Sequence, residues 1–220
     1  MRYPQTLESG VLIRRYKRFL ADIQMDDGRL LTAHCANTGA MTHCADPGCR
    51  VWLLDSGNPK RKYRYSWEWT EVDGRYKACI NTARANQLVA EALQEGRLTG
   101  MDGYTDIRRE PAVEDGRLDF CLTAADKSDL WIEVKSVTLA RLPVTADSTG
   151  LAVCFPDAVT ERGRKHLLRL QQLVEQGHRA MLVFCVAIEA ATDVSVAADI
   201  DPAYAATLAD VMTAGVEGLC

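Results

Sequence analysis

Two carboxylates and a lysine stand close together in a stretch of strand-forming residues, RLDFCLTAADKSDLWIEVKSVT, at 117–138. Asp119 is the lone acid of the first apolar run, and Glu133 and Lys135 stand two residues apart in the second. Because side chains alternate along a strand, Glu133 and Lys135 share one face, opposite their apolar neighbours. The types and spacing of these residues suit the binding of a divalent metal ion and a phosphate.

The polar turn at 125–129 predicts that these two runs form a hairpin. Pairing about this turn places Asp119 opposite a residue between Glu133 and Ser136, so the charged groups converge on one patch of sheet. Asp119 and Glu133 offer oxygen ligands for Mg²⁺ or Mn²⁺. Lys135 could orient an attacking water or stabilise charge on phosphoryl oxygens. A pair of charges such as Glu133 and Lys135 is also common at the solvated edge of a sheet, and it is Asp119 across the hairpin that favours a site for hydrolysis of a phosphodiester.

A helix is predicted before this hairpin, from about Asn81 to Glu95, with an apolar stripe of Leu88, Ala92 and, less centrally, Val89 and Leu93. Glu91 stands at the margin of the stripe. It could point towards the sheet or into solvent, and the spacing alone favours solvent.

A second helix is predicted after the hairpin, with Thr160 as its N-cap and Gly177 at its end. Its first turns carry several basic residues, among them Arg162, Lys165 and His166. Cations at a helix start oppose the helix dipole, and a bound phosphate would favour them there. A solvated basic face is the alternative.

The N-terminal third of the chain has the pattern of short strands. The strand-like runs cover 11–23, 29–35, 51–54, 63–70 and 76–80. Asp26-Asp27-Gly28 and Asp73-Gly74 have the composition of hairpin turns. Five short strands without a convincing helix predict a small β-barrel.

The segment NPKRKYRYSWEW at 58–69 interleaves cations with aromatic residues. Cations contact phosphates and aromatic faces stack on bases in proteins that bind single strands. Alternatively, the strand buries alternate aromatics and its cations face solvent. The residues predicted to contact nucleic acid are Arg15, Lys17, Arg18, Lys60, Arg61, Lys62, Arg64, Trp67, Arg162 and Lys165.

Composition narrows the class of protein. The chain has 220 residues, of which 47% are hydrophobic and 25% charged, enough for a full core. It has no run of eighteen apolar residues and no secretory signal pattern, so no membrane association is expected. Eight scattered cysteines without a CxxC motif predict free thiols in the reducing cytoplasm.

The charge is uneven along the chain. Residues 1–80 carry 13 Lys and Arg against 9 Asp and Glu, whereas the remainder is acidic and brings the total to −4. A basic N-terminal part is compatible with binding to nucleic acid in spite of the acidic average.

The C-terminal part alternates helices and strands. A loop is predicted at 140–151, a buried strand at 178–188, a helix at 201–214 and the start of a strand at 216–220. The expected organisation is a β-barrel domain at 1–80, followed by an α/β domain at 81–220.

Several stretches in collinear order resemble the sugar fermentation stimulation protein A (SfsA) family. They are RYKRFLAD, HCANTGAM, PKRKY, INTARANQLVAEAL, IRRE, RLDF, EVKSVTLA and FPDAVTERGRKHL. The resemblance implies an OB-fold-like barrel followed by a PD-(D/E)XK nuclease-like domain with a mixed sheet. It also implies non-specific DNA binding and a proposed role in regulating maltose metabolism.

The nuclease pattern transfers onto particular residues. The resemblance implies that Asp119 is the lone acid, that 133–135 is the ExK element, and that Glu91 is the acid of the first helix. Asp119, Glu133 and Glu91 would then be catalytic residues and metal ligands, with Lys135 also catalytic. Related nucleases often place a polar helix where Arg162 and Lys165 fall. The family pattern differs from this chain in having a shorter loop after TLA and a longer C-terminal tail.

Two functions remain open at this point. One is a DNA-binding protein, plausibly a regulator, that has a nuclease-like metal site. The other is an active Mg²⁺- or Mn²⁺-dependent nuclease that acts on DNA or RNA, with the barrel holding the substrate. A protein-interaction scaffold is a third option, for which the residues offer nothing positive. The sequence does not determine the oligomeric state.

Overall fold

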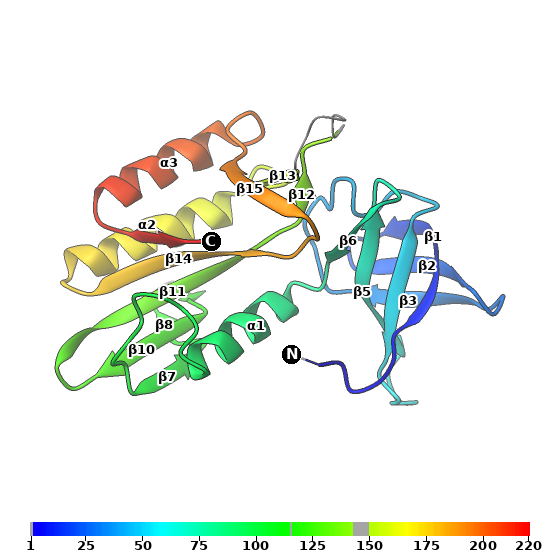
Figure 1. Ribbon diagram of the computed structural model, residues 1–220, viewed down its shortest axis with the longest axis horizontal. Helices are drawn as coiled ribbons and strands as arrows, with labels where there is room; N and C mark the ends of the chain where they lie inside the picture. The colour runs from blue at the N-terminus through cyan, green and yellow to red at the C-terminus, as the bar shows by residue number, and fades with distance from the viewer. Residues whose placement is uncertain (1, 115, 143–149) are drawn as a thin grey trace. The chain divides into compact units, whose positions relative to one another are not determined.

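A computed structural model describes residues 2–114, 116–142 and 150–220 of the chain (Figure 1). It divides into two compact units. The barrel unit comprises the described parts of Met1–Arg84, Val137–Asp157 and Val186–Ser195, and the sheet unit comprises those of Ala85–Ser136, Ala158–Cys185 and Val196–Cys220. The chain therefore passes from one unit to the other several times.

Five strands close the barrel. The strands of this region are β1 (Glu8–Tyr16), β2 (Leu20–Met25), β3 (Leu30–Cys35), β4 (Arg50–Asp55), β5 (Tyr65–Val72) and β6 (Tyr76–Cys79). Their order is β3-β2-β1-β4-β5-β6, and a further pairing of β3 with β5 closes the ring. This is the five-stranded barrel of an OB fold, as predicted, with β6 added along β5.

The predicted strand at 11–23 is two strands. Tyr16 of β1 pairs with Leu20 of β2, and the residues between them form a tight turn. Lys17 and Arg18 have positive φ angles of 50° and 65°. The turn lacks the Gly, Asn or Pro that usually indicates one, which explains why the residue pattern did not reveal it.

Trp67 does not lie on a nucleic-acid surface, and this prediction is wrong. Its side chain is fully buried in the barrel core, and its indole Nε1 donates a hydrogen bond to the Trp69 carbonyl at 2.9 Å. Tyr65 is also buried. The strand buries aromatic residues, whereas Lys60 and its basic neighbours precede it in the β4–β5 loop.

A small three-stranded sheet is formed by β12 (Leu139–Ala140), β13 (Leu151–Phe155) and β15 (Ala191–Val196). The sequence did not indicate β15. β12 and β13 flank the predicted loop at 140–151, and residues 143–149 of that loop lie outside the described part of the chain.

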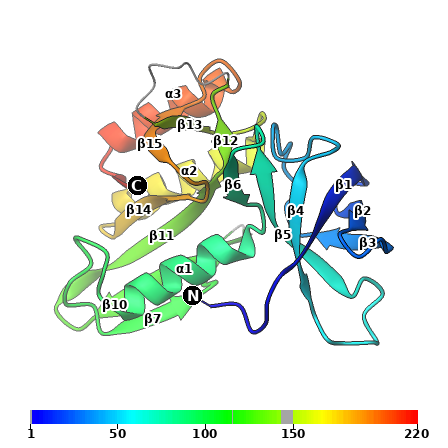
Figure 2. The ribbon, with the colours of Figure 1, turned by 45° about the vertical axis from the view of Figure 1, so that its right-hand side comes forward.

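The sheet unit contains a five-stranded mixed sheet. Its elements are α1 (Ala83–Gln94), β7 (Asp106–Arg109), β8 (Ala112–Val113), β9 (Gly116–Arg117), β10 (Phe120–Ala124), β11 (Lys127–Val137), α2 (Glu161–Glu175), β14 (Arg179–Val186), α3 (Pro202–Thr213) and β16 (Glu217–Leu219). The strand order is β16-β14-β11-β10-β7. β14 and β16 are parallel, whereas β10 is antiparallel to both of its neighbours. Helix α1 covers one face, and α2 and α3 cover the other (Figures 1 and 2).

Capping side chains start the helices where the sequence predicts. The Thr160 hydroxyl accepts a hydrogen bond from the Gly163 backbone N–H at 3.0 Å, at the beginning of α2. The Asp201 carboxylate accepts one from the Tyr204 N–H at 2.9 Å, at the beginning of α3. These bonds satisfy N–H groups that have no partner within the helix.

The apolar stripe of α1 agrees with the prediction only in part, because Val89 and Leu93 are buried as expected whereas Leu88 is not. Its buried residues are Ala85, Val89, Ala90 and Leu93. Leu88, predicted to be central, is 39% exposed. Small alanines let the helix lie close to the sheet residues Phe120, Leu122, Leu130 and Ile132. Among the described residues, no helix has both the length and the apolar character needed to span a membrane.

Candidate active site

The β10–β11 hairpin positions the predicted acids. Phe120 pairs with Ile132, and the Asp119 backbone N–H donates to the Ile132 carbonyl at 3.1 Å. Asp119 immediately precedes β10 and therefore lies beside Glu133 of β11. This is within the span that the sequence predicted for its partner.

The two faces of the hairpin have different surroundings. Phe120, Ile132 and Val134 belong to the core beneath α1. Glu133 points to the opposite face, where it is 5% exposed. Strand alternation therefore separates the apolar side chains from the charged ones, as predicted.

Glu133 contacts two basic groups. The Lys135 ammonium donates to Glu133 Oε1 at 2.6 Å, and His166 Nδ1 of α2 is hydrogen-bonded to the same oxygen. Burial alone would raise the pKa of Glu133. The hydrogen bond from His166 and the charge of Lys135 outweigh burial and hold the pKa of Glu133 below its ordinary value. Glu133 is therefore ionised at neutral pH.

Asp119 has the opposite tendency. Burial and the negative charge of Glu133 raise the pKa of Asp119, and the hydrogen bonds that it accepts do not fully offset them. Those bonds come from the Val134 backbone N–H at 2.7 Å and from Asn86 Nδ2 of α1 at 2.6 Å. Two acids thus stand close together, one of them in an environment that disfavours its charge.

Three side chains of the site were missed or only loosely indicated by the sequence. Asn86 orients Asp119, and His166, noted only as part of a basic helix, contacts Glu133. Tyr204 of α3 is buried nearby, where burial and the charges of Glu133 and Asp201 raise the pKa of its phenol. The only sequence signal for Asn86 was that it is a polar residue next to the alanines of the predicted helix.

The structure does not bring Glu91 to Asp119 and Glu133, contrary to the prediction. Glu91 follows Asn86 by five residues, which is about 140° around the helix axis. Asn86 faces Asp119, so Glu91 lies on another side of α1. Among the described residues, no three His, Cys, Asp or Glu side chains are grouped closely enough to hold a metal.

We call the group of Asp119, Glu133 and Lys135 the carboxylate site. This site suits a divalent cation that needs few protein ligands. Mg²⁺ is usually held by one or two carboxylates and completes its shell with water and substrate phosphate. Asp119 and Glu133 supply that number. Burial and the charge of Glu133 raise the pKa of Asp119, and a bound cation would offset both effects.

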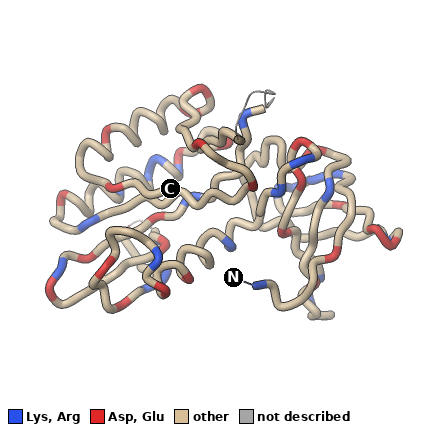
Figure 3. Tube along the Cα trace, viewed as in Figure 1, with Lys and Arg blue, Asp and Glu red and all other residues tan. Residues whose placement is uncertain are grey.

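Helix α2 carries further Lys and Arg residues in its first turns (Figure 3). Arg162 Nε donates to His166 Nε2 at 3.4 Å, and the Lys165 side chain is exposed. Both residues line a concave basic pocket. The residues of this basic pocket are Val113, Gly116, Arg117, Leu118, Arg162, Lys165, His166 and Arg169.

Some of the basic barrel residues have structural partners. The Arg15 guanidinium donates to the backbone carbonyls of Asn37 and Gly39 at 3.0 and 2.9 Å and so supports the loop after β3. Arg64 forms an ion pair with Asp55. Their charges are therefore already engaged within the barrel.

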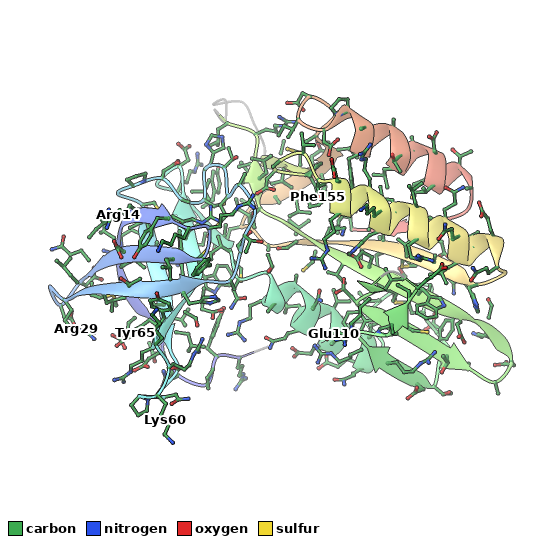
Figure 4. All side chains as sticks on the ribbon, turned by 180° about the vertical axis from the view of Figure 1, so that it is seen from behind. Arg14, Arg29, Lys60, Tyr65, Glu110 and Phe155 are labelled. Atoms are coloured by element: carbon green, nitrogen blue, oxygen red, sulfur yellow. The ribbon has the colours of Figure 1, made fainter. Side chains whose placement is uncertain are left out.

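The other predicted barrel cations lie in two exposed turns. Lys17 and Arg18 are exposed at the β1–β2 turn. Lys60, Arg61 and Lys62 are exposed in the β4–β5 loop, where Lys60 projects away from the strands (Figure 4). OB folds use the corresponding two loops to bind oligonucleotides.

Comparisons with known proteins agree with this architecture. Residues 13–80 match the family model described as "SfsA N-terminal OB domain", and residues 83–220 match "Sugar fermentation stimulation protein RE domain". The second domain is therefore restriction-endonuclease-like.

Full-length relatives are similar over nearly the whole chain. A sugar fermentation stimulation protein homolog of Psychromonas ingrahamii is 46% identical and covers 98% of this chain and 94% of its own length. A homolog of Pseudomonas aeruginosa is 49% identical, with 100% and 91% covered. The solved structure of Pyrococcus furiosus SfsA in complex with Ca²⁺ has a TM-score of 0.85 at 27% identity and covers 99% of this chain and 88% of its own.

Proposed function

Because this chain belongs to the sugar fermentation stimulation protein (SfsA) family, we propose that it binds DNA and hydrolyses phosphodiester bonds at the carboxylate site with a divalent cation. The observation that carries this proposal is the convergence of Asp119, Glu133 and Lys135 in one largely buried patch. Two acids beside each other are costly to bury, and a bound cation offsets that cost.

Asp119 and Glu133 would hold the cation. When bound, a divalent cation neutralises phosphate charge and activates water for attack on phosphorus. The use of a divalent cation is supported by the Pyrococcus furiosus relative, which was solved with Ca²⁺. We extend this property to the present chain, with Mg²⁺ or Mn²⁺ as the expected ions.

The neighbouring groups orient the Asp119 carboxylate and keep the Glu133 carboxylate ionised. Asn86 and the Val134 N–H hold the Asp119 carboxylate in place through hydrogen bonds. His166 and Lys135 keep Glu133 ionised. The Lys135 ammonium is also placed to donate a hydrogen bond to a phosphoryl oxygen or to the attacking water.

The barrel is the proposed grip on DNA. Five of its exposed cations lie in the two loops through which OB folds bind nucleic acid, at 17–18 and 60–62. Cations in such loops neutralise backbone phosphates without reading the base sequence. This arrangement supports the proposal of non-specific DNA binding, and RNA is an alternative ligand.

DNA binding without cleavage is the second candidate. The observation in its favour is that Glu133 Oε1 is already engaged by Lys135 and His166, which compete with a cation for this oxygen. The protein would then act as a DNA-binding accessory factor or regulator with a nuclease-like fold, since fold alone does not imply activity.

The test is incubation with single- and double-stranded DNA and RNA in the presence of Mg²⁺ or Mn²⁺. Cleavage is expected, and it should be lost in Asp119→Asn and Lys135→Ala. The matched control is Lys127→Ala, which removes the same charge from the far end of the same strand. Binding without cleavage across all substrates and metals would leave the second candidate.

A further inference from the structure

We propose that the basic pocket binds the terminal phosphate monoester of a nucleic-acid strand and so holds a strand end beside the carboxylate site. This inference rests on the proposed function, because it takes the ligand to be a nucleic acid. It adds a substrate preference, namely phosphorylated ends over internal positions.

The pocket is built from two elements of the sheet unit. Arg162, Lys165 and Arg169 of α2 are spaced by three and four residues, which places them on one helix face. The other wall is formed by residues of strands β8 and β9 and the residue after β9, namely Val113, Gly116, Arg117 and Leu118. Arg162 and Lys165 were predicted from the sequence to contact nucleic acid, whereas Arg117 and Arg169 were not.

The pocket has an excess of positive charge. Four of its described lining residues are Lys or Arg, and none of those described is Asp or Glu. Arg169 pairs with Glu114 at 3.0 Å, but Glu114 is 85% exposed. Arg117 pairs with Glu110 at 3.4 Å, and both side chains are exposed. The Arg117–Glu110 pair is exposed on both sides and contributes little, so a phosphate can replace Glu110 at low cost. The Arg169 side chain is only 12% exposed, and it adds positive charge to the pocket wall while it stays paired with Glu114.

The number of cations favours a monoester over a diester. A phosphate monoester carries a charge of about −1.5 to −2 at neutral pH and offers three acceptor oxygens. An internal phosphodiester carries only one negative charge. One guanidinium group can donate two parallel hydrogen bonds to two oxygens of a phosphate. A concave site with several guanidinium groups therefore suits the phosphate monoester, which carries the higher charge.

One side chain of the pocket also contacts the carboxylate site. His166 lines the pocket, accepts a hydrogen bond from Arg162 at Nε2, and contacts Glu133 through Nδ1. Leu118, another lining residue, immediately precedes Asp119. A phosphate in the pocket therefore lies one side chain away from the acids, and cleavage is expected close to a phosphorylated end.

The test measures binding by Asp119→Asn protein in EDTA, so that no cleavage occurs. Three oligonucleotides of one sequence, with an internal fluorophore, carry a 5′-phosphate, a 3′-phosphate or no terminal phosphate. One phosphorylated form is expected to bind at least about tenfold more tightly, as charge-assisted hydrogen bonds would give. Adding Lys165→Gln and Arg117→Gln should abolish this preference.

The matched control is Arg97→Gln with Lys127→Gln, which removes two exposed cations outside the pocket and should keep the preference. Equal affinity for the three oligonucleotides overturns the proposal. An equal loss for all three in the pocket variant also overturns it, because the pocket would then hold an internal phosphodiester.

A second measurement needs no DNA. Inorganic phosphate is expected to raise the thermal midpoint of the Asp119→Asn protein more than that of the same protein with the two pocket substitutions. If no oligonucleotide binds but this difference is present, the nucleic-acid function fails while the anion site stands. If DNA binds without end preference and phosphate has no pocket-dependent effect, the pocket proposal fails while the proposed function stands.

Discussion

The two units bury carboxylates in contrasting ways. In the barrel unit, Glu68 is 1% exposed and accepts hydrogen bonds from Arg84 Nε at 2.8 Å, Arg84 Nη2 at 3.1 Å and Asn81 Nδ2 at 3.0 Å. In the sheet unit, Asp119 and Glu133 lie beside each other, and burial together with the charge of Glu133 raises the pKa of Asp119.

The difference indicates which charges serve the fold and which serve a ligand. The charge of the buried Glu68 is compensated within the protein by the partly buried Arg84, and it needs no ligand. The two neighbouring acids of the carboxylate site have only one lysine and one histidine as basic neighbours. The pKa of Asp119 is still raised, so its ionised form is disfavoured in the folded protein. Such perturbed groups concentrate at functional sites.

The largest expected effect is the loss of stability when the ion pair of Glu68 and Arg84 in the barrel unit is broken. Arg84→Met would leave the Glu68 carboxylate buried without its cation and lower the free energy of unfolding by about 3–5 kcal/mol. Urea denaturation measures this loss. Arg75→Met, an exposed cation in the β5–β6 turn, is the control and should change little. An unchanged stability in Arg84→Met would show that the barrel acid does not depend on its arginine.

Asp119→Asn tests the opposite expectation in the sheet unit. Calcium affinity should fall by more than about 100-fold, since a ligand is lost, whereas loss of a supporting group costs 10–100-fold. The thermal midpoint without metal should rise, because the neighbouring negative charge is removed. Isothermal titration and a thermal melt measure the two quantities. A lower midpoint would contradict the claim that the charge of Asp119 is costly.

The supporting histidine gives an intermediate effect. His166→Ala removes the hydrogen bond that helps to keep Glu133 ionised, and divalent-cation affinity or cleavage should fall by about 10–100-fold. Gln172→Ala, an exposed position on the same helix, is the control. If His166→Ala instead tightens cation binding, the histidine competes with the cation rather than supporting its ligand.

The pH dependence of stability separates the two acids of the site. Because the pKa of Asp119 is raised on folding, its ionisation lowers stability as the pH rises through that pKa. Asp119→Asn should therefore become more stable than the wild type as the pH rises above the ordinary Asp pKa of about 3.9. Glu133, with a lowered pKa, stabilises above its unfolded pKa and loses this contribution as the pH falls through its folded pKa. Denaturation of metal-free protein at several pH values measures both trends.

The smallest expected effect concerns the exposed barrel cations. Replacing Lys60, Arg61 and Lys62 by Gln should weaken DNA binding and reduce its salt slope by up to about 0.9 for each phosphate that the protein no longer neutralises. Arg75→Gln with Lys77→Gln is the control, since both residues are exposed outside the two loops. An unchanged slope would remove the β4–β5 loop from the proposed interface.

The predicted fold was correct. The predicted number of barrel strands was also correct, but only because two errors in the strand assignment cancelled. Five strands were expected in the barrel, but one of them, at 11–23, is two strands, and β6 at Tyr76–Cys79 does not help to close the ring. Local composition marks turns that contain Gly or Asp and misses the turn at Lys17 and Arg18. The closing pair β3–β5 joins distant segments, and no local pattern indicates it.

The sequence by itself determined the hairpin that brings Asp119 beside Glu133 and the caps Thr160 and Asp201. Strand alternation, turn composition and capping act over a few residues, so they can be recognised in the chain.

Only the tertiary structure decided which side chains surround the acids. It placed His166 on Glu133 and Asn86 on Asp119, turned Glu91 to another side of α1, and buried Trp67. The physical reason is that the rotation of a helix or strand about its axis depends on what packs against it. Packing between distant segments selects that rotation, and residue spacing leaves more than one choice open.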